Sequence, residues 1–512
     1  MLLPRYRKVV RMPESLDTRA TFSQFGLWAG VIAFITVLMV GPPASLTVES
    51  QLLSPAWVAL ALLVLMATWW VTEAIPIAVT ALLPMIVLPL TGTLSIADAA
   101  APYMHPIVVL LMGGFMFAKA LERWRLHERI ALNIVYRSSG SPSQLVGSFM
   151  LAAALLSMWI SNTATCIMMV PIAMSVASAA QADNERPEHF RTALLLGIAY
   201  GCSIGGLGTP IGTPTNLIVI GYLSAESDLD ISFGQWLAFG LPVVALLLPA
   251  AWWVLTRWVF ALPQTANTAA RGAVEDALQR LGPMQSSERR VVVVFVVIAA
   301  LWIFRRPMSL IEIPLPGGPI APFAFLTDHI IAVIAVLLVF LVRAGGGKRD
   351  ALLDWASAER IPWGVVLLFG GGMSLANAIN TTGLGLFFGE SLAGASALPL
   401  WVLILMLTAA ILMLTEVTSN VATASALMPV MGALALSASL PVEVLAAPIA
   451  LAASCAFMFP MATGPNAVVF ASGGFSMLTM ARVGLRLNMI AVLVITLAAI
   501  FLAPQVLGSP GG

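Results

Sequence analysis

The sequence has few charged residues and hardly any cysteine. Only 10% of its 512 residues are Asp, Glu, Lys or Arg, whereas soluble proteins carry roughly 25%. The net charge of +1 gives no reason to expect nucleic acid as a partner. Its three cysteines, Cys166, Cys202 and Cys455, all lie in apolar segments. Their positions therefore suggest neither a disulfide framework nor a metal site.

Apolar residues fill the space that charged ones leave. They make up 60% of the chain, and the mean hydropathy is +0.96. Runs of about 20 apolar residues, the length that crosses a ~30 Å hydrocarbon core, recur along the chain. Because lipid offers no partner to backbone polar groups, these runs predict an all-α polytopic membrane protein. We expect about eleven transmembrane helices, at residues 24–41, 55–72, 74–92, 105–122, 192–222, 236–260, 289–304, 328–343, 361–379, 445–475 and 485–507.

Two further apolar regions, near 143–181 and 397–437, are each split midway by a polar Ser-Asn motif. A helix that crossed the membrane there would carry these polar residues at its centre. We therefore interpret both regions as re-entrant hairpins.

The basic residues predict the orientation of the chain. With the N-terminus in the cytoplasm, all but Arg305 and Arg306 of the 25 Lys and Arg residues lie in or beside cytoplasmic segments. An odd number of crossings then places the C-terminus outside. Residues 1–23 lack a signal-peptide core and are interpreted as a cytoplasmic leader. The polar stretch 263–288 is interpreted as a cytoplasmic linker between two halves, 24–262 and 289–512.

The two halves repeat a pattern of polar and small residues. Gly114 and Gly372, Ser161 and Ser419, Asn162 and Asn420, and Pro171 and Pro429 are all separated by 258 residues. GTPTN at 212–216 corresponds to ATGPN at 462–466, now at an offset of 250. An odd number of crossings in each half turns the second copy upside down, which predicts an inverted repeat.

The repeated motifs predict ion sites. Each Ser-Asn motif opens the second helix of its hairpin, where free N–H groups and a partial positive charge favour anions. The segments 201–216 and 453–466 interrupt long helices with Gly, Pro and Thr, which frees carbonyl oxygens suited to Na⁺. Asn162 with the Gly212 carbonyl, and Asn420 with the Ala462 carbonyl, are the predicted cation sites.

These motifs resemble those of the divalent anion/sodium symporters, which include sodium-dependent dicarboxylate, citrate and sulfate carriers. The resemblance extends from WWVTEAIPIAVTALLP (69–84) to about residue 475, and SCAFMFPMATGPNAVV (454–469) is its most specific part. It implies an elevator mechanism, sodium as coupling ion with no organic cofactor, and a homodimer in the plasma membrane. The sodium ligands that it implies are Ser157, Ser161, Asn162 and Gly212 for one site and Thr415, Thr418, Asn420 and Ala462 for the other. The substrate contacts that it implies are Ser161, Asn162, Thr163, Thr213, Pro214, Ser419, Asn420, Val421, Thr463 and Gly464.

One departure from the family affects the choice of substrate. Many dicarboxylate carriers have Ser-Asn-Thr in both hairpins, but the second hairpin here has Val421 in place of Thr. Losing one hydroxyl donor to a buried carboxylate costs about 1 kcal/mol. This departure points to a smaller anion, such as sulfate, or to a different diacid. With the family resemblance, the sequence still favours sodium-coupled symport of C4-dicarboxylates, with a sodium/sulfate symporter and a sodium-independent dicarboxylate exchanger as alternatives. It gives no catalytic constellation, so we expect a transporter and no enzyme.

Glu73 and Glu416 are acidic residues in or beside membrane segments. Intramembrane carboxylates are functional candidates by default. Proton coupling through Glu416, close to Ser419, is one interpretation. A structural carboxylate that accepts hydrogen bonds in the hairpin is the interpretation that we favour.

Overall fold

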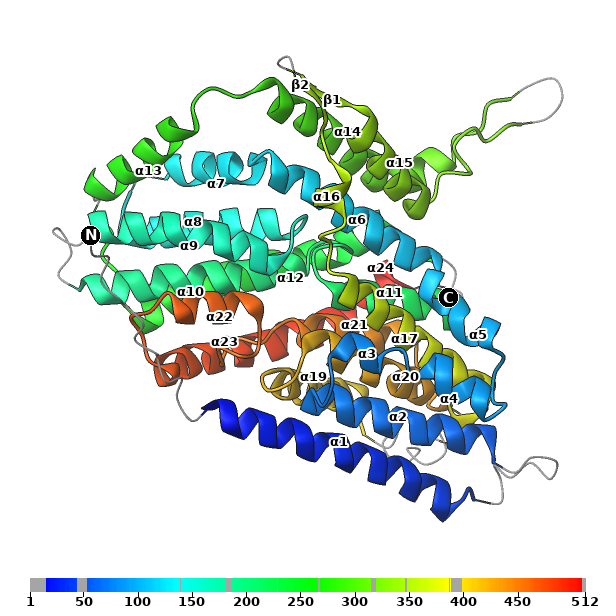
Figure 1. Cartoon of the computed structure of the whole chain (residues 1–512). Coiled ribbons are helices and arrows are strands. Elements are labelled where there is room, and N and C mark those ends of the chain that lie inside the picture. Colours follow the sequence, from blue (N-terminus) through cyan, green and yellow to red (C-terminus); the bar gives the residue numbers. More distant parts are fainter. Residues whose placement is uncertain are drawn as a thin grey trace, which may run out of the picture.

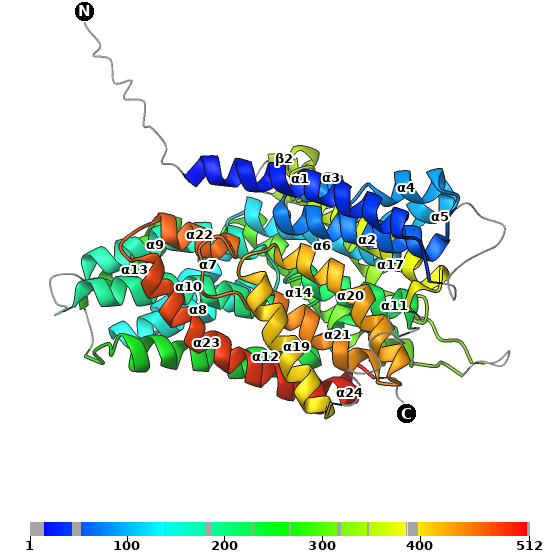
Figure 2. The same cartoon turned by 90° about the horizontal axis from the view of Figure 1, so that it is seen from below.

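Figures 1 and 2 show the computed structural model of the chain, which describes residues 15–508 apart from 44–52, 139, 181–185, 228, 266–267, 315–318, 346–347, 386 and 388–397. Most of the described residues are helical. One small sheet, in which β1 (Arg343–Gly345) pairs antiparallel with β2 (Lys348–Ala351), interrupts them. The prediction of an all-α fold is confirmed.

The first half of the chain supplies helices of very different lengths. In order, they are α1 (Ser15–Val40), α2 (Pro55–Thr72), α3 (Ile77–Thr80), α4 (Pro84–Leu90), α5 (Ile96–Ala100), η2 (Ala101–Met104), α6 (Pro106–Arg123), α7 (Leu126–Tyr136), α8 (Pro142–Ser157), α9 (Asn162–Ala179), α10 (Pro187–Gly206), α11 (Pro214–Glu226), α12 (Phe233–Trp253) and η4 (Val254–Val259).

The polar linker and the second half after it supply the remaining part of the chain. Its helices are α13 (Thr268–Leu281), α14 (Ser286–Ser309), α15 (Asp328–Leu341), α16 (Trp355–Ala358), α17 (Trp363–Thr381), α19 (Leu400–Thr415), α20 (Asn420–Ser437), α21 (Val442–Ala453), α22 (Gly464–Ala471), α23 (Met477–Leu497), η6 (Ala498–Leu502) and α24 (Ala503–Val506).

Length and composition mark this as a multi-pass membrane protein. In the described part of the chain, eight helices are long and apolar enough to cross a membrane, and six shorter apolar helical segments accompany them. The predicted hairpins coincide with two pairs of these helices, α8 with α9 and α19 with α20, which pack against each other.

Two predicted spans are interrupted helices, as their composition indicated. The span 192–222 consists of α10 and α11, with a segment of turns between Gly206 and Pro214. The span 445–475 consists of α21 and α22, with a longer segment between Ala453 and Gly464. Proline lacks a backbone N–H and glycine is a weak helix former, so Gly, Pro and Thr in these segments end the first helix and start the second.

Three boundaries differ from the sequence prediction. The span 74–92 is two short helices, α3 and α4, because Pro76 and Pro84 each start a new helix. Helix α1 begins at Ser15, within the predicted leader 1–23, although its apolar stretch long enough to cross a membrane begins only at Ser23, and residues 1–14 lie outside the described chain. The polar linker contains α13, which packs against α7 and α9.

Helices of each half pack against helices of the other half. Figure 1 shows α22 from the second half beside α10, and α22 contacts both α9 and α10. In return, α11 from the first half packs against α20 and α21. Hydrogen bonds cross the same boundary, because Tyr200 Oη donates to the Phe457 carbonyl at 3.0 Å and Arg191 Nη2 donates to the Ser472 carbonyl at 3.1 Å. The residues that both halves contribute therefore meet at the centre of the molecule.

Candidate functional site

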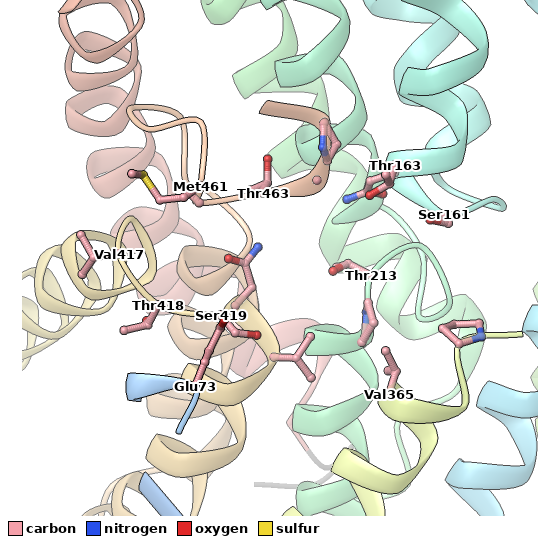
Figure 3. Close-up of a pocket in the computed structure, with 18 of the residues that line it drawn as sticks. Glu73, Ser161, Thr163, Thr213, Val365, Val417, Thr418, Ser419, Met461 and Thr463 are labelled. Carbon is pink, nitrogen blue, oxygen red and sulfur yellow. The ribbon is translucent and has the colours of Figure 1, made fainter. Parts of the chain in front are cut away.

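A cavity of about 590 Å³ lies where the two hairpins and the two interrupted helices meet. Figure 3 shows Thr163, Thr213, Thr463 and Ser419 around this common space. The cavity is lined by Ser23, Val71, Thr72, Glu73, Phe115, Ser161, Asn162, Thr163, Ile211, Gly212, Thr213, Pro214, Pro362, Val365, Val417, Thr418, Ser419, Asn420, Val421, Met461, Ala462, Thr463, Gly464 and Pro465.

Four helices begin at the wall of this cavity. The lining includes the first residues of α9, α11, α20 and α22, which are Asn162, Pro214, Asn420 and Gly464. Helix N-termini carry free N–H groups and a partial positive charge, so they attract anions. Among the residues that the structure describes, no Lys, Arg or His lines the cavity, and Glu73 is its one ionisable side chain. Any attraction of the cavity for an anion therefore comes from backbone groups and hydroxyls.

The two hairpins hold their central asparagines in the same way. In the first, Ser157 Oγ donates a hydrogen bond to Asn162 Oδ1. In the second, Thr415 Oγ1 donates to Asn420 Oδ1 at 2.7 Å and also bonds the Ala453 carbonyl at 2.8 Å. Ser157 and Thr415 are fully buried behind the cavity wall. Each asparagine is thus fixed in orientation by a hydroxyl from the preceding helix of its hairpin.

A second pair of asparagines holds the interrupted helices in shape. Asn216 Nδ2 donates to the carbonyls of Gly206 at 3.0 Å and Thr209 at 2.8 Å. Asn466 Nδ2 donates to the equivalent carbonyls, Ala456 and Phe459, both at 3.0 Å. Sequence reasoning did not single out these two residues. The sequence did contain a sign of their importance, because Asn216 and Asn466 occupy equivalent positions in the repeated segments GTPTN and ATGPN.

The first predicted cation site is a close cluster of oxygen atoms. A Cβ on Gly206 would lie 3.0 Å from Asn162 Oδ1 and 3.2 Å from the Gly212 carbonyl oxygen. A Cβ on Gly212 would lie 2.5 Å from the Gly206 carbonyl oxygen. Only glycine at both positions lets these atoms approach one another. Carbonyl and amide oxygens gathered by unwound backbone are the donors that transporters use for sodium, so the residues present fit that ion.

The second predicted cation site has the same hairpin geometry. Asn420 and Ala462 line the cavity, and Thr415 supports Asn420 from behind. Thr418 also lines the cavity, but its Oγ1 donates to the Leu414 carbonyl at 2.8 Å and lies 2.7 Å from Thr423 Oγ1. Its hydroxyl therefore already has two partners within the hairpin.

The structure brings nearly all of the predicted site residues to one place. Ser157 and Thr415 lie behind the cavity, and the others line it. Those others are Ser161, Asn162, Thr163, Gly212, Thr213, Pro214, Thr418, Ser419, Asn420, Val421, Ala462, Thr463 and Gly464.

The two halves are in close contact at Thr163 and Gly464. A Cβ on Gly464 would lie 2.1 Å from Thr163 Oγ1, so the tip of the first hairpin presses against the start of α22. In the repeat, the counterparts of these residues are Val421 and Pro214. Both line the cavity, and Val421 packs against two apolar clusters. One end of the cavity is therefore more polar than the other.

The two acidic candidates have different positions. Glu73 lines the cavity at its exposed edge, with a left-handed φ of 47° at the end of α2. Glu416 is 1% exposed and does not line the cavity. Its carboxylate accepts hydrogen bonds from the backbone of Phe457, Met458 and Phe459. These donors lie beyond the hairpin, in the segment between α21 and α22, so Glu416 does accept hydrogen bonds, but not within the hairpin as the structural interpretation expected.

Sequence reasoning missed the apolar part of the lining. Phe115, Ile211, Val365, Val417 and Met461 line the cavity, and they come from five separate stretches of the chain. Apolar residues are so common in a membrane protein that no local signal distinguishes those that face a cavity from those that face lipid.

Several known proteins are similar to this chain in sequence, and a solved structure is similar in fold. The profile described as the sodium:sulfate symporter transmembrane region matches residues 25–507. A sodium-dependent dicarboxylate transporter, SdcS, of Staphylococcus saprophyticus is 36% identical over 492 residues, which cover 94% of this chain and 92% of that protein. SdcS of Staphylococcus aureus strain MRSA252 is 35% identical over 515 residues, which cover 99% of this chain and 96% of that protein.

A solved structure shows the same fold at much lower sequence identity. The crystal structure of the Alcanivorax borkumensis YdaH transporter aligns with a TM-score of 0.55 and 15% identity, covering 97% of this chain and 100% of that one. It supports the all-α membrane architecture alone. The family profile and the relatives extend over almost the whole chain, and the chain therefore belongs to the sodium:sulfate symporter family.

Proposed function

We propose that this protein is a secondary active transporter that couples the entry of sodium to the uptake of small divalent anions, principally C4-dicarboxylates. The observation that carries the proposal is the central cavity, into which four helix N-termini open without any cationic side chain. The relatives named sodium-dependent dicarboxylate transporters support the choice of ion and substrate.

The anion site would be built from both halves. Backbone N–H groups at the starts of α9 and α20, with the hydroxyls of Thr163, Thr213 and Thr463, face one space. A cavity of about 590 Å³ is in the range that holds small ligands. The proposed substrate contacts are Ser161, Asn162, Thr163, Thr213, Pro214, Ser419, Asn420, Val421, Thr463 and Gly464.

Two sodium ions would flank the anion. Ser157, Ser161, Asn162 and Gly212 would hold one, and Thr415, Thr418, Asn420 and Ala462 would hold the other. Because the cavity wall carries no positive side chain, bound sodium would offset the charge of the substrate. Anion binding would then be favourable only when sodium is present, which is the physical basis of coupling.

The wider architecture belongs to the same proposal. The chain would lie in the plasma membrane with its N-terminus in the cytoplasm and its C-terminus outside, as an inverted repeat of 24–262 and 289–512. The distribution of Lys and Arg supports this orientation. The hairpins and interrupted helices would move together as an elevator within a homodimer.

Two related transport functions are alternatives to this proposal. Sulfate is the anion for which the family is named, and Val421 removes a hydroxyl donor from the site, so a sodium/sulfate symporter is one alternative. A sodium-independent dicarboxylate exchanger is the other, since an exchanger needs the anion site alone.

Uptake by purified protein in proteoliposomes separates the three functions. Labelled succinate is supplied with or without an inward sodium gradient, and excess sulfate serves as competitor. Sodium-driven succinate uptake that sulfate does not suppress is the expected result. Uptake that ignores sodium but needs internal diacid indicates the exchanger. Sodium-driven uptake of labelled sulfate without succinate uptake indicates the sulfate symporter.

A further inference from the structure

Glu416 is a buried carboxylate whose hydrogen-bond partners lie in the α21–α22 loop and on α23. Its Oε1 accepts from Phe457 N at 2.8 Å and from Asn488 Nδ2 at 2.7 Å. Both carboxylate oxygens lie 3.0 Å from Met458 N. Oε2 also accepts from Phe459 N at 3.2 Å. Three consecutive backbone N–H groups thus form a concave anion site around one side chain.

No opposite charge pairs with this carboxylate. In the part of the chain that the structure describes, the ion pairs do not include Glu416. Burying an ionised carboxylate is costly even when hydrogen bonds satisfy it. A sodium ion at the second proposed site, on the same hairpin, would supply a positive charge close by.

Hydrogen bonds of Glu416 and of its neighbour also connect the second hairpin with the α21–α22 loop, the two parts that form the second proposed cation site. Thr415, the preceding residue, bonds both Asn420 on the hairpin and the Ala453 carbonyl at the start of the loop. Glu416 then holds the loop through its N–H groups, while Asn466 holds it through its carbonyls. The loop leads directly to Ala462, so the hairpin amide and the loop carbonyl are fixed relative to each other.

The first half has no such carboxylate. Met158 occupies the position that corresponds to Glu416 at the repeat offset. There the loop between α10 and α11 is held by a neutral bond, from Thr209 Oγ1 to the Met158 carbonyl. The two proposed cation sites therefore differ in that a carboxylate holds the loop beside the second site, whereas a neutral hydroxyl holds the loop beside the first.

We infer that Glu416 is a positioning residue for sodium, which locks the α21–α22 loop to the second hairpin and raises the sodium affinity of the second cation site. This inference rests on the proposed sodium coupling. A neutral side chain of the same shape would both remove the charge and turn an NH₂ group toward backbone donors. The loop would then lose the contacts that hold the Ala462 carbonyl in place.

The test compares Glu416→Gln with Glu416→Asp and with a matched neutralisation, Glu443→Gln. Glu443 is also buried, but it lies in the first turn of α21, at the end remote from the loop. One measurement is the rise in Tm of purified protein when NaCl replaces choline chloride, which reports sodium binding without transport. The other is the sodium concentration that gives half-maximal succinate uptake in proteoliposomes, alongside the KM for succinate at saturating sodium.

Glu416→Gln is expected to raise the half-maximal sodium concentration about ten-fold, the effect of losing charge-assisted hydrogen bonds, and to shrink the sodium-dependent rise in Tm. The KM for succinate at saturating sodium should change little. Glu416→Asp should recover part of the sodium affinity, and Glu443→Gln should match the wild type. An unchanged sodium dependence in a folded Glu416→Gln protein overturns the inference.

Two further outcomes keep the test decisive. Should Glu416→Gln not fold, Asn488→Ala removes one donor from the same carboxylate and leaves its charge. It should then raise the half-maximal sodium concentration several-fold, and wild-type behaviour would overturn the inference. A wild-type protein that ignores sodium in both measurements refutes the proposed function itself, whereas sodium-dependent wild type with normal variants refutes the role of Glu416 alone.

Discussion

Asn420 Oδ1 accepts a hydrogen bond from Thr415 Oγ1 at 2.7 Å, and Asn162 accepts the equivalent bond from Ser157 in the other half of the chain. The repeat offset of 258 residues relates both members of the two pairs. The two hairpins thus preserve a side-chain contact as well as a sequence motif. A contact that fixes the direction of an amide oxygen is useful where that oxygen must meet an ion.

Replacing either asparagine with alanine is expected to lower sodium-driven uptake strongly. Asn162→Ala and Asn420→Ala each remove an oxygen that faces the cavity, and hydrogen bonds to charged groups contribute about 1.5–3 kcal/mol each. Uptake at low sodium should fall by roughly 10- to 100-fold. Proteoliposome uptake and size-exclusion profiles provide the measurement. Asn133→Ala, on α7 with its amide bonded to the Arg129 carbonyl, is the control. Normal uptake by both site variants contradicts the proposed site.

A methyl group at Gly206 should weaken sodium binding. It would lie 3.0 Å from Asn162 Oδ1 and 3.2 Å from the Gly212 carbonyl oxygen, closer than most real contacts of this kind. Relieving strain of about 1 kcal/mol by moving these oxygens should raise the half-maximal sodium concentration roughly five-fold.

Gly272→Ala is the matched control for Gly206→Ala. Gly272 is also helical, in α13, and its added Cβ meets open space. Alanine there should leave sodium dependence unchanged and raise the free energy of unfolding by about 0.5–1 kcal/mol, because alanine favours helix. If the Gly206→Ala and Gly272→Ala variants have the same sodium affinity, Gly206 does not help to form the first predicted cation site.

Val421→Thr tests whether the second hairpin touches the substrate. Threonine has nearly the volume of valine and adds one hydroxyl donor to the cavity wall. A new hydrogen bond of about 1 kcal/mol should lower the KM for succinate roughly five-fold. Burying that hydroxyl beside the apolar neighbours of Val421 should also lower Tm slightly. A KM equal to that of the wild type would show that position 421 does not contact succinate.

The contact between Thr163 and Gly464 predicts non-additive stability. Gly464→Ala places a Cβ 2.1 Å from Thr163 Oγ1, so this variant alone should lower Tm markedly. Thr163→Ala removes the opposing hydroxyl, and the double variant should recover much of the loss. Residues in direct contact show coupling of about 0.5–3 kcal/mol. Additive Tm changes in a double-mutant cycle would mean that the two residues do not press on each other.

Much of this fold was predictable because polar residues are rare in the sequence. In an apolar chain, Ser161 and Ser419 stand out, and their motifs predicted α8 with α9 and α19 with α20. The helix breaks were predictable for the same reason, since Gly and Pro cluster at 201–216 and 453–466. The span 74–92 was wrongly predicted as one helix, because its apolar run hides the helix starts at Pro76 and Pro84.

Other features depend on contacts that no local pattern contains. The three N–H donors to Glu416 lie about 40 residues further along the chain, and backbone groups leave no trace in the sequence. The packing of α22 against α9 and α10 is equally long-range. The placement of the site residues at one cavity matches the resemblance to the family, but their roles in binding sodium and substrate stay predictions.

Because helices of each half pack against helices of the other, the order of synthesis limits when the protein can finish folding. α9 and α10 leave the ribosome long before α22, the helix that packs against both. Until synthesis reaches Gly464, the tip of the first hairpin faces no partner at Thr163, and polar hydroxyls and amides there stand open. The cavity is therefore complete only after synthesis has passed α22, and a chain that ends before α22 lacks the part of the cavity wall that Thr463 and Gly464 supply.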